Sequence, residues 1–345
     1  PAPGALSVRH FAREVDTTWR RTSYSALSHV EAPPGPGVGS EPDVTAKDDE
    51  EVADLPVAPD PTIGPLSPMA ALPVGATFGS LVHAVLEHTD PATGDLRGEL
   101  LRHITEQVTW WPVDVDHEAL ADALVAVCDS PLGPAVGDAT LRHIGLRDRL
   151  RELDFELPLS GGDLHPERPG ALLGDLAPLL LRHLPEGDPV RGYAEALARP
   201  ALGQQSLRGY LTGSVDVVLR VRPEGGDPVD SVRYVIVDYK TNWLGPRDEP
   251  LTADAYRPAA LDAAMEHSDY PLQALLYAVV LHRFLRWRQP GYDPERHLGG
   301  VLYLYLRGMC GPETPVVDGH PCGVFTWRPP VALLDDLSDL LDGVA

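Results

Sequence analysis

Cysteine is scarce in this sequence, which has only Cys128, Cys310 and Cys322 among 345 residues. Thiols so few and so scattered offer neither a disulfide framework nor a zinc pattern, which is typical of the reducing cytosol. Long hydrophobic runs are also lacking, because no stretch approaches the roughly 20 apolar residues that cross a bilayer. No basic segment followed by an apolar one marks a secretory signal. We therefore expect a cytoplasmic protein with no membrane partner.

Positive charge is in short supply, since 28 Lys and Arg stand against 51 Asp and Glu, for a net charge of −23. A protein that holds a polyanion by itself usually carries a basic surface. Composition alone therefore favours an acidic, solvated surface that meets no nucleic acid. The alternatives are a local cationic channel, or a partner that holds the nucleic acid and feeds it in.

The chain is long enough, and with 43% hydrophobic residues apolar enough, to bury a sizeable core. Residues 1–31 read as a connecting segment in which a serine caps a short helix. Residues 32–68 are rich in Pro, Gly, Asp and Glu without periodicity, which predicts a disordered linker. Residues 69–345 then form one domain, with a helical part at about 76–150 and a catalytic core at about 151–345. Within that helical part we expect helices over residues 96–108, 117–129 and 141–149.

Two apolar strands each deliver a carboxylate to one region. Residues 234–237 are apolar and run into Asp238, Tyr239 and Lys240, and alternation places Asp238 and Lys240 on one face. Residues 210–221 form a second strand that carries Asp216, and the turn-like residues 222–228 join the two as a hairpin. Antiparallel pairing would bring Asp216 beside Asp238. Two carboxylates about 4 Å apart repel by about 4 kcal/mol at an effective dielectric of 20, so the pattern predicts a divalent cation between them.

Other candidate polar residues lie on predicted helices and on a third strand. A helix from about residue 76, with Thr77 as its cap, places His83 and Glu87 on one face, although a lone histidine there is usually structural. Residues 151–159 alternate as a half-buried strand whose acidic face is solvated in the simplest interpretation. A helix over 270–287 stacks an amide and a phenol four residues apart, which equally suits a structural pair. The remaining elements are helices at 253–266 and 331–341, strands at 300–307 and 323–327, and an insertion at 160–209.

The tail of that long helix, residues 282–288, interleaves arginines with Phe284 and Trp287. Such a mixture suits a nucleic-acid backbone or an acidic partner surface. A solvated helix end is an equally good interpretation. Arg283, Arg286 and Arg288 would form a local basic patch there.

Taken in order, these residues resemble one family. Gly79-x-x-x-His83-x-x-x-Glu87, Gly213-x-x-Asp216, Asp238-x-Lys240 and Gln273-x-x-x-Tyr277 are similar to the ordered motifs of RecB-type nucleases, members of the PD-(D/E)xK superfamily. The similarity extends from about Trp19 to the end of the chain and includes residues 238–245 and 299–308. Several motifs in order are far more specific than any one of them.

The resemblance implies an α/β fold of the restriction-endonuclease type, a mixed sheet flanked by helices with a helical subdomain. It implies DNA cleavage with Mg²⁺, a site that Mn²⁺ or Ca²⁺ can also occupy. The implied roles are metal ligation by His83, Asp216, Asp238 and the Tyr239 carbonyl, catalysis by Asp216, Asp238, Lys240 and Glu152, and substrate positioning by Gln273 and Tyr277. Glu156 is the alternative to Glu152.

The resemblance also implies partners beyond DNA, namely RecC-like and RecD-like subunits and a helicase part of the same chain that precedes these residues. Some relatives carry an iron–sulfur cluster, and three cysteines without the family spacing predict none here. Two rival interpretations stay open: a catalytically inactive nuclease fold that guides DNA or docks partner subunits, and an unrelated acidic protein that binds cations.

Overall fold

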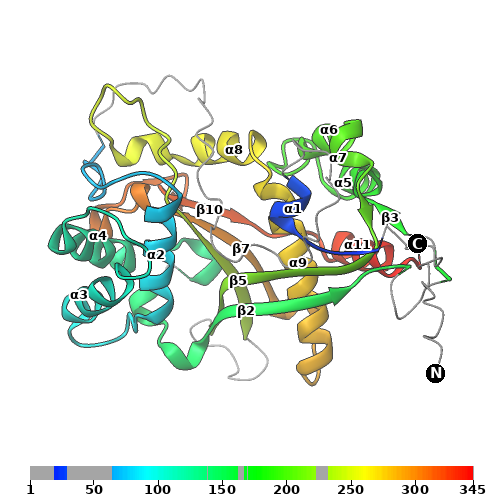
Figure 1. Cartoon of the computed structure of the whole chain (residues 1–345), viewed down its shortest axis with the longest axis horizontal. Coiled ribbons are helices and arrows are strands. Elements are labelled where there is room, and N and C mark those ends of the chain that lie inside the picture. The colour runs from blue at the N-terminus through cyan, green and yellow to red at the C-terminus, as the bar shows by residue number, and fades with distance from the viewer. Residues whose placement is uncertain are drawn as a thin grey trace, which may run out of the picture.

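The computed structural model describes residues 19–28, 64–137, 139–161, 167–168, 170–222 and 232–344. Its centre is a mixed sheet of six strands, in the order β1-β5-β6-β7-β10 with β2 paired to β5 (Figure 1). Neighbouring strands are parallel in the pairs β1–β5 and β6–β7 and antiparallel in the others. The strands are β1 (Arg20–Ser23), β2 (Arg149–Pro158), β5 (Gly209–Val221), β6 (Arg233–Lys240), β7 (Leu298–Tyr305) and β10 (Val324–Trp327). The predicted mixed sheet is confirmed.

Strand β5 is long enough to pair with different neighbours at its two ends. On one edge it is antiparallel to β2 from Tyr210 to Leu219. On the other edge β1 pairs with residues 209–212 and β6 with residues 217–221, so neither covers residues 213–216. The sheet therefore opens in the middle of β5, where Asp216 stands.

Helices cover both faces of the sheet, and alternation along the strands assigns side chains to each face. On β6, Val235 and Val237 join the core cluster beneath α2 (Ala76–His88), α3 (Leu96–Gln107) and α4 (His117–Asp129). Ile236 points into the other cluster, which includes α9 (Tyr270–Arg288) and α11 (Val331–Asp342). Both faces of the sheet are thus buried, which explains why the strands carry continuous apolar runs.

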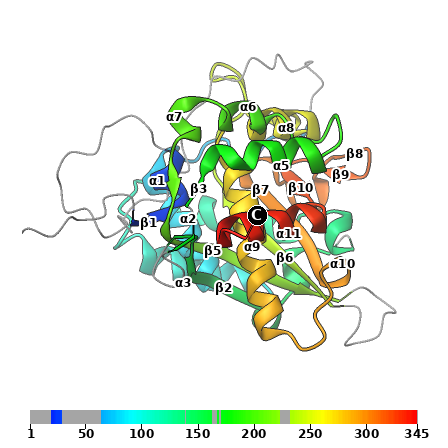
Figure 2. The same ribbon diagram turned by 90° about the vertical axis from the view of Figure 1, so that its right-hand side faces the viewer.

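The insertion at 160–209 packs onto the cluster on the α9 face of the sheet, with α5 lying against α11 (Figure 2). Its elements are β3 (Ala171–Leu172), α5 (Leu176–His183), α6 (Tyr193–Leu197), α7 (Pro200–Gly203) and β4 (Ser206–Leu207). The other short elements are α1 (Tyr24–Ser28), α8 (Pro258–Glu266), α10 (Pro294–His297), β8 (Val316–Val317) and β9 (His320–Pro321). No helix within the described ranges has the length and apolar character to traverse a bilayer.

Two predicted helices are wrong in part. Residues 141–149 form two 3₁₀ turns, Leu141–His143 and Leu146–Asp148, separated by Gly145, before β2 begins. A segment this short has little helical stability of its own, and Arg149 instead donates to the carbonyls of Leu141 and Ile144. Residues 253–266 divide into a 3₁₀ turn and α8 because Pro258 holds the preceding residue extended, with ψ of 156° at Arg257.

The predicted linker and one predicted cap also need correction. Residues 29–63 lie outside the described part of the chain, but Ser67 already donates to the Leu251 carbonyl at 2.9 Å and Leu66 bridges to Thr252. The packed structure thus includes residues 64–68, which the sequence assigned to the linker. Thr77 lies inside α2, whose N-cap is Gly75. The serine cap is confirmed at Ser23, whose Oγ accepts the Ala26 N–H at 3.2 Å.

A fully buried arginine joins the end of β6 to the start of α2. The Arg307 guanidinium donates to the carbonyls of Thr241 and Met69, both at 2.7 Å, and also to that of Pro73. It lies over the rings of Phe78 and Trp243, 5.3 and 5.5 Å from their centroids. Because Thr241 follows Lys240 directly and Phe78 is in the first turn of α2, Arg307 sets where that helix meets the strand.

We expect Arg307→Met to lower the free energy of unfolding by about 3 kcal/mol or more, because buried carbonyls would lose charged donors. Urea denaturation measures the change. The matched control is Arg182→Met, whose side chain is 65% exposed in an ion pair with Asp336 and should change stability by less than about 1 kcal/mol. Equal effects of the two substitutions would contradict the structural role given to Arg307.

Candidate active site

The candidate site lies where β6 leaves β5. Main-chain pairing of these strands runs as far as Val217 and Val237, so the next residues, Asp216 and Asp238, face each other across the ladder. The Tyr239 N–H donates at 3.0 Å to Oδ2 of Asp216, so this carboxylate accepts from the main chain where the pairing of β5 with β6 ends. Both carboxylates are buried, with 7% and 3% of their surface exposed. The predicted hairpin and the closeness of the two acids follow from this register.

Lys240 is buried with the acid that precedes it by two residues. Its Nζ lies 2.7 Å from Oδ1 of Asp238, and only 2% of the residue is exposed. The ammonium also lies 4.2 Å from the centre of the Tyr270 ring and 5.4 Å from that of Tyr303. An ammonium and a carboxylate buried together stabilise each other's charged form, and the aromatic faces add a further attraction for the cation.

The amide of Gln273 connects this ion pair to α9. Its Oε1 accepts from Lys240 Nζ at 3.4 Å and from the Tyr303 hydroxyl at 2.9 Å, and its Nε2 donates to the Tyr277 hydroxyl at 3.4 Å. The structure therefore places Gln273 against the lysine, and Tyr277 beyond it, packed edge-on against Phe155 of β2. The predicted i,i+4 pair is real, although both residues are buried and not on an open helix face.

Burial fixes the protonation state of the phenols around the site. It raises the pKa of Tyr277 above its ordinary value, with the nearby Asp238 carboxylate adding to the effect, and does the same for Tyr303. Burial also raises the pKa of Tyr239 to about 12. These side chains therefore stay neutral at physiological pH, so each hydroxyl keeps its proton and does not act as a base.

His83 reaches the acids from the opposite layer. It lies on α2, buried, with Nδ1 3.1 Å from Oδ2 of Asp216. Its ring also packs edge-on against Tyr239, with centroids 5.8 Å apart. Helices from both faces of the sheet thus contribute to one cluster, His83 from α2 and Gln273 from α9.

Glu152 and its alternative, Glu156, have different surroundings. The flanking pairs Arg151–Val217 and Leu153–Val215 set Glu152 opposite Asp216, and its Oε2 accepts from Ser214 at 2.8 Å. Its φ of 43° is left-handed, a conformation that costs a non-glycine residue about 1–3 kcal/mol. Glu156 lies further along β2 in an exposed ion pair with Arg21 at 2.6 Å. Of these two acids, Glu152 is the one in register with Asp216, and its role as a third carboxylate stays a prediction.

The donor chemistry of the cluster suits a divalent cation. Carboxylate oxygens with a single imidazole are ligands that Mg²⁺ or Mn²⁺ accepts, and two buried acids on adjacent strands need a counter-charge. In the described part of the chain, however, no three His, Cys, Asp or Glu side chains converge to hold a metal ion. The structure brings together His83 with Asp216 and Asp238 with Lys240, so the four-ligand set stays a prediction.

The basic tail of α9 differs from expectation at one position. Arg283 is mostly buried and donates to Ser338 of α11, with its guanidinium 2.9 Å from Asp342. It secures α11 and does not belong to the predicted local patch. Arg286 and Arg288 are exposed.

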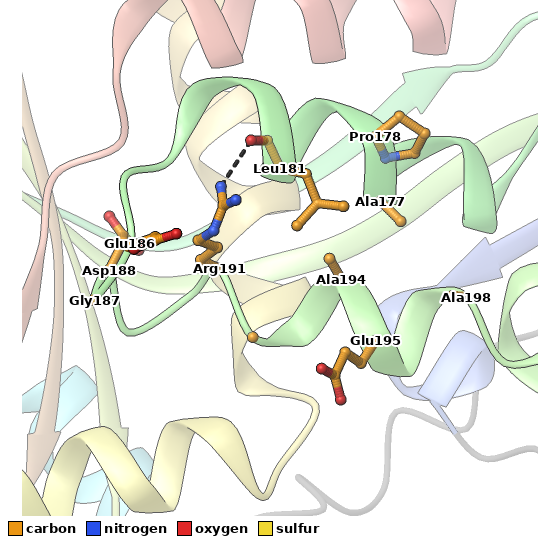
Figure 3. A pocket seen from close by; sticks show the side chains of 11 residues that line it. Ala177, Pro178, Leu181, Glu186, Gly187, Asp188, Arg191, Ala194, Glu195 and Ala198 are labelled. Atoms are coloured by element: carbon orange, nitrogen blue, oxygen red, sulfur yellow. Dashed lines mark hydrogen bonds between the residues drawn. The ribbon is translucent and has the colours of Figure 1, made fainter.

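A cavity of about 520 Å³ lies between α5 and α6, distant in sequence from every residue of the site (Figure 3). Ala177, Leu181 and Ala194 line it, and Arg191 reaches across it to the Leu181 carbonyl. No residue of the candidate site lines this cavity.

The sequence interpretation missed Tyr270, Tyr303 and Ser214. Tyr303 stands in register with Asp238 on the neighbouring strand, and its ring stacks on Tyr270 with centroids 5.8 Å apart. Tyr270 lies one helical turn before Gln273, so the helix period could have indicated it. Nothing local could have indicated Tyr303, because its closeness to Asp238 depends on a parallel pairing across about 60 residues of chain.

The sequence of the chain is similar to those of several known proteins. The family described as the PD-(D/E)XK nuclease superfamily matches residues 64–322. A protein of Mycolicibacterium smegmatis named RecBCD enzyme subunit RecB is 57% identical over 100% of this chain and 31% of its own length. The proteins of that name from Mycobacterium tuberculosis and Escherichia coli K12 are 56% and 31% identical, over 99% and 98% of the chain.

The chain spans about a third of the length of the mycobacterial relatives, 31% and 30%, and 24% of the Escherichia coli protein. The matched family covers β2, β5, β6 and β7 of the sheet, α2 with His83, the acid pair, Lys240 and the whole of α9. The resemblance to RecB-type nucleases that the motifs indicated is thereby confirmed, and the chain belongs to the PD-(D/E)XK nuclease superfamily.

Proposed function

We propose that this chain hydrolyses DNA phosphodiester bonds with a divalent metal ion, as the nuclease part of a RecBCD-type complex. The observation that carries the proposal is the buried Asp238–Lys240 pair beside Asp216 and His83. A fold rarely retains four ionisable side chains in so small a buried volume unless they serve chemistry. In DNA repair and recombination, such a part would act on single strands that a helicase delivers.

The partners follow from the relatives and from the charge. The relatives are named as RecB subunits of RecBCD and are about three times as long as this chain. We infer a helicase part in the same polypeptide and RecC-like and RecD-like subunits around it. A net charge of −23 supports this arrangement, because an acidic chain repels the phosphates of DNA and delivery by a partner would offset that repulsion.

Each residue of the cluster has a role in the proposed reaction. Asp216, Asp238 and His83, with the Tyr239 carbonyl, would hold Mg²⁺, which polarises a phosphate and lowers the pKa of a bound water. Lys240 lies beside Asp238, where its charge can offset negative charge that develops on the transferring phosphate or orient the attacking water. Gln273 and the Tyr270 and Tyr303 rings hold the lysine in place. Tyr277, a neutral phenol, can donate to a phosphate oxygen.

A catalytically inactive scaffold is the second candidate, because a nuclease fold can guide DNA without cutting it. The complete set of His83, Asp216, Asp238 and Lys240 argues against it, since a scaffold gains nothing from buried charges. The strained backbone at Glu152 argues in the same direction.

We expect Asp238→Asn and Lys240→Met each to slow degradation of single-stranded DNA with Mg²⁺ by at least about 100-fold, a barrier increase of about 3 kcal/mol. Unfolding is measured on the same samples, because removing one partner of a buried ion pair also destabilises the fold. The control, Asp122→Asn, removes an acid that is 62% exposed on α4 and should leave the rate unchanged. Wild-type turnover in either site variant would refute the assignment.

Glu152 and Glu156 provide a matched pair four residues apart on one strand. We expect Glu152→Gln to reduce the cleavage rate by about ten-fold or more, because Glu152 stands opposite Asp216. Glu156→Gln should leave the rate within about two-fold, since it loses only an exposed ion pair with Arg21. The reverse ranking in a single-turnover assay would make Glu156 the third carboxylate.

Metal binding has a test that does not depend on activity. We expect Mg²⁺ or Mn²⁺ to raise the melting temperature, since a ligand at about 100 times its Kd adds about 2.7 kcal/mol of stability. The Asp216→Asn/Asp238→Asn double variant should lose that shift, with its signal in titration calorimetry. An equal shift in the double variant would mean that the cations bind the acidic surface elsewhere.

A further inference from the structure

One face of α9 runs continuously from the candidate site to the exposed end of the helix. Gln273, Tyr277, Val280, Phe284 and Trp287 follow one another at spacings of four, three, four and three residues. This spacing keeps side chains in a single stripe along an α-helix. The stripe begins at the amide that contacts Lys240 and ends at an indole that is 76% exposed.

The stripe is buried over its first three residues and exposed at its end, where its last two aromatic rings are in contact. Gln273, Tyr277 and Val280 are buried, Phe284 is half-buried and Trp287 is exposed. Phe284 packs edge-on against Trp287, with centroids 6.4 Å apart, and the Arg288 guanidinium lies 4.9 Å from the centre of the indole. In Figures 1 and 2 this end of α9 projects below the neighbouring strands. The indole thus contacts Phe284 and Arg288 and is still largely open to solvent.

Two arginines beside this indole differ from the exposed arginines that are held in ion pairs. Arg97, Arg102 and Arg182 are exposed and each contacts a carboxylate. Within the ranges that the structure describes, Arg286 and Arg288 have no carboxylate within 4.0 Å, although acids outnumber bases almost two to one in the chain. Two arginines that make no carboxylate contact therefore stand beside an exposed indole, on a chain whose net charge is negative.

We propose that the end of α9, formed by Phe284, Arg286, Trp287 and Arg288, is a stacking platform for single-stranded nucleic acid on its way to the candidate site. Exposed aromatic rings stack on bases of any sequence, and neighbouring arginines attract the phosphates between them. This inference rests on the proposed function and adds a binding site remote from the reacting groups.

The length of the helix sets how much nucleic acid lies between the two sites. Trp287 is 14 residues from Gln273, which is about 21 Å at a rise of about 1.5 Å per residue. At the roughly 3.4 Å spacing of stacked nucleotides this corresponds to about six nucleotides. An acidic protein could also form ion pairs with the arginines. Ion pairing alone, however, does not use the flat, solvent-facing indole or the arginine stacked beside it.

The test compares Trp287→Ala with Trp110→Ala, because Trp110 is equally exposed, at 78%. No cation stacks on Trp110 among the described residues. Binding of a fluorescent 20-nucleotide oligo(dT) to the 345-residue chain is followed by anisotropy at low salt in EDTA, which prevents cleavage. We expect Trp287→Ala to weaken binding by about ten-fold, as for the loss of one stacked base, and Trp110→Ala to have no effect. Arg286→Glu/Arg288→Glu should weaken it further and flatten its salt dependence.

Equal affinities of the Trp287→Ala and Trp110→Ala chains would overturn the platform. So would unaltered DNA binding by Trp287→Ala combined with weaker association with helicase-containing subunits, since the surface would then be a protein contact. Cleavage by the wild-type chain is measured separately with Mg²⁺. A chain that binds through Trp287 but does not cleave would refute the proposed function and leave the platform standing.

Discussion

The burial of Lys240 against Asp238 is the constraint on which the rest of the site depends. An ammonium that is 2% exposed survives in a protein interior only where its charge is met, and here a carboxylate, an amide oxygen and two aromatic faces meet it. Those partners come from β6, β7 and α9. The Lys240–Asp238 ion pair and its partners therefore hold α9 against the sheet. A change in the core around α9 would also displace residues of the candidate site.

The opening in the sheet supplies the second acid. Because β5 pairs with β1 at one end and with β6 at the other, neither of these two strands covers the short edge at residues 213–216. Asp216 occupies that edge and accepts a main-chain N–H from Tyr239, while His83 approaches from α2. Arg307 then holds the start of α2 against the residue that follows Lys240. The site thus takes residues from β5 and β6, where they diverge, and from helices on both faces of the sheet.

The net charge of the chain bears on how DNA would reach the site in the proposed function. A chain with a net charge of −23 repels phosphate over most of its surface. The end of α9 is an exception, with Arg286, Arg288 and an exposed indole together. An acidic chain with arginines and an exposed indole at the end of α9 is in keeping with the proposed function, in which a motor delivers the strand.

The sequence by itself determined the elements and the candidate residues. The apolar run into Asp238 and Lys240, the long helix with Gln273 and Tyr277, and the hairpin partner with Asp216 all depend on local periodicity, which neighbouring residues specify. The errors were local as well: Gly145 and Pro258 interrupt predicted helices, and Thr77 lies inside α2 although it was expected as a cap.

Only the tertiary structure decided which side chains meet. It set Glu152 and not Glu156 beside Asp216, brought Tyr303 to Lys240, and turned Arg283 toward α11. Those outcomes depend on strand register and on packing between segments far apart in the chain, which no local pattern encodes.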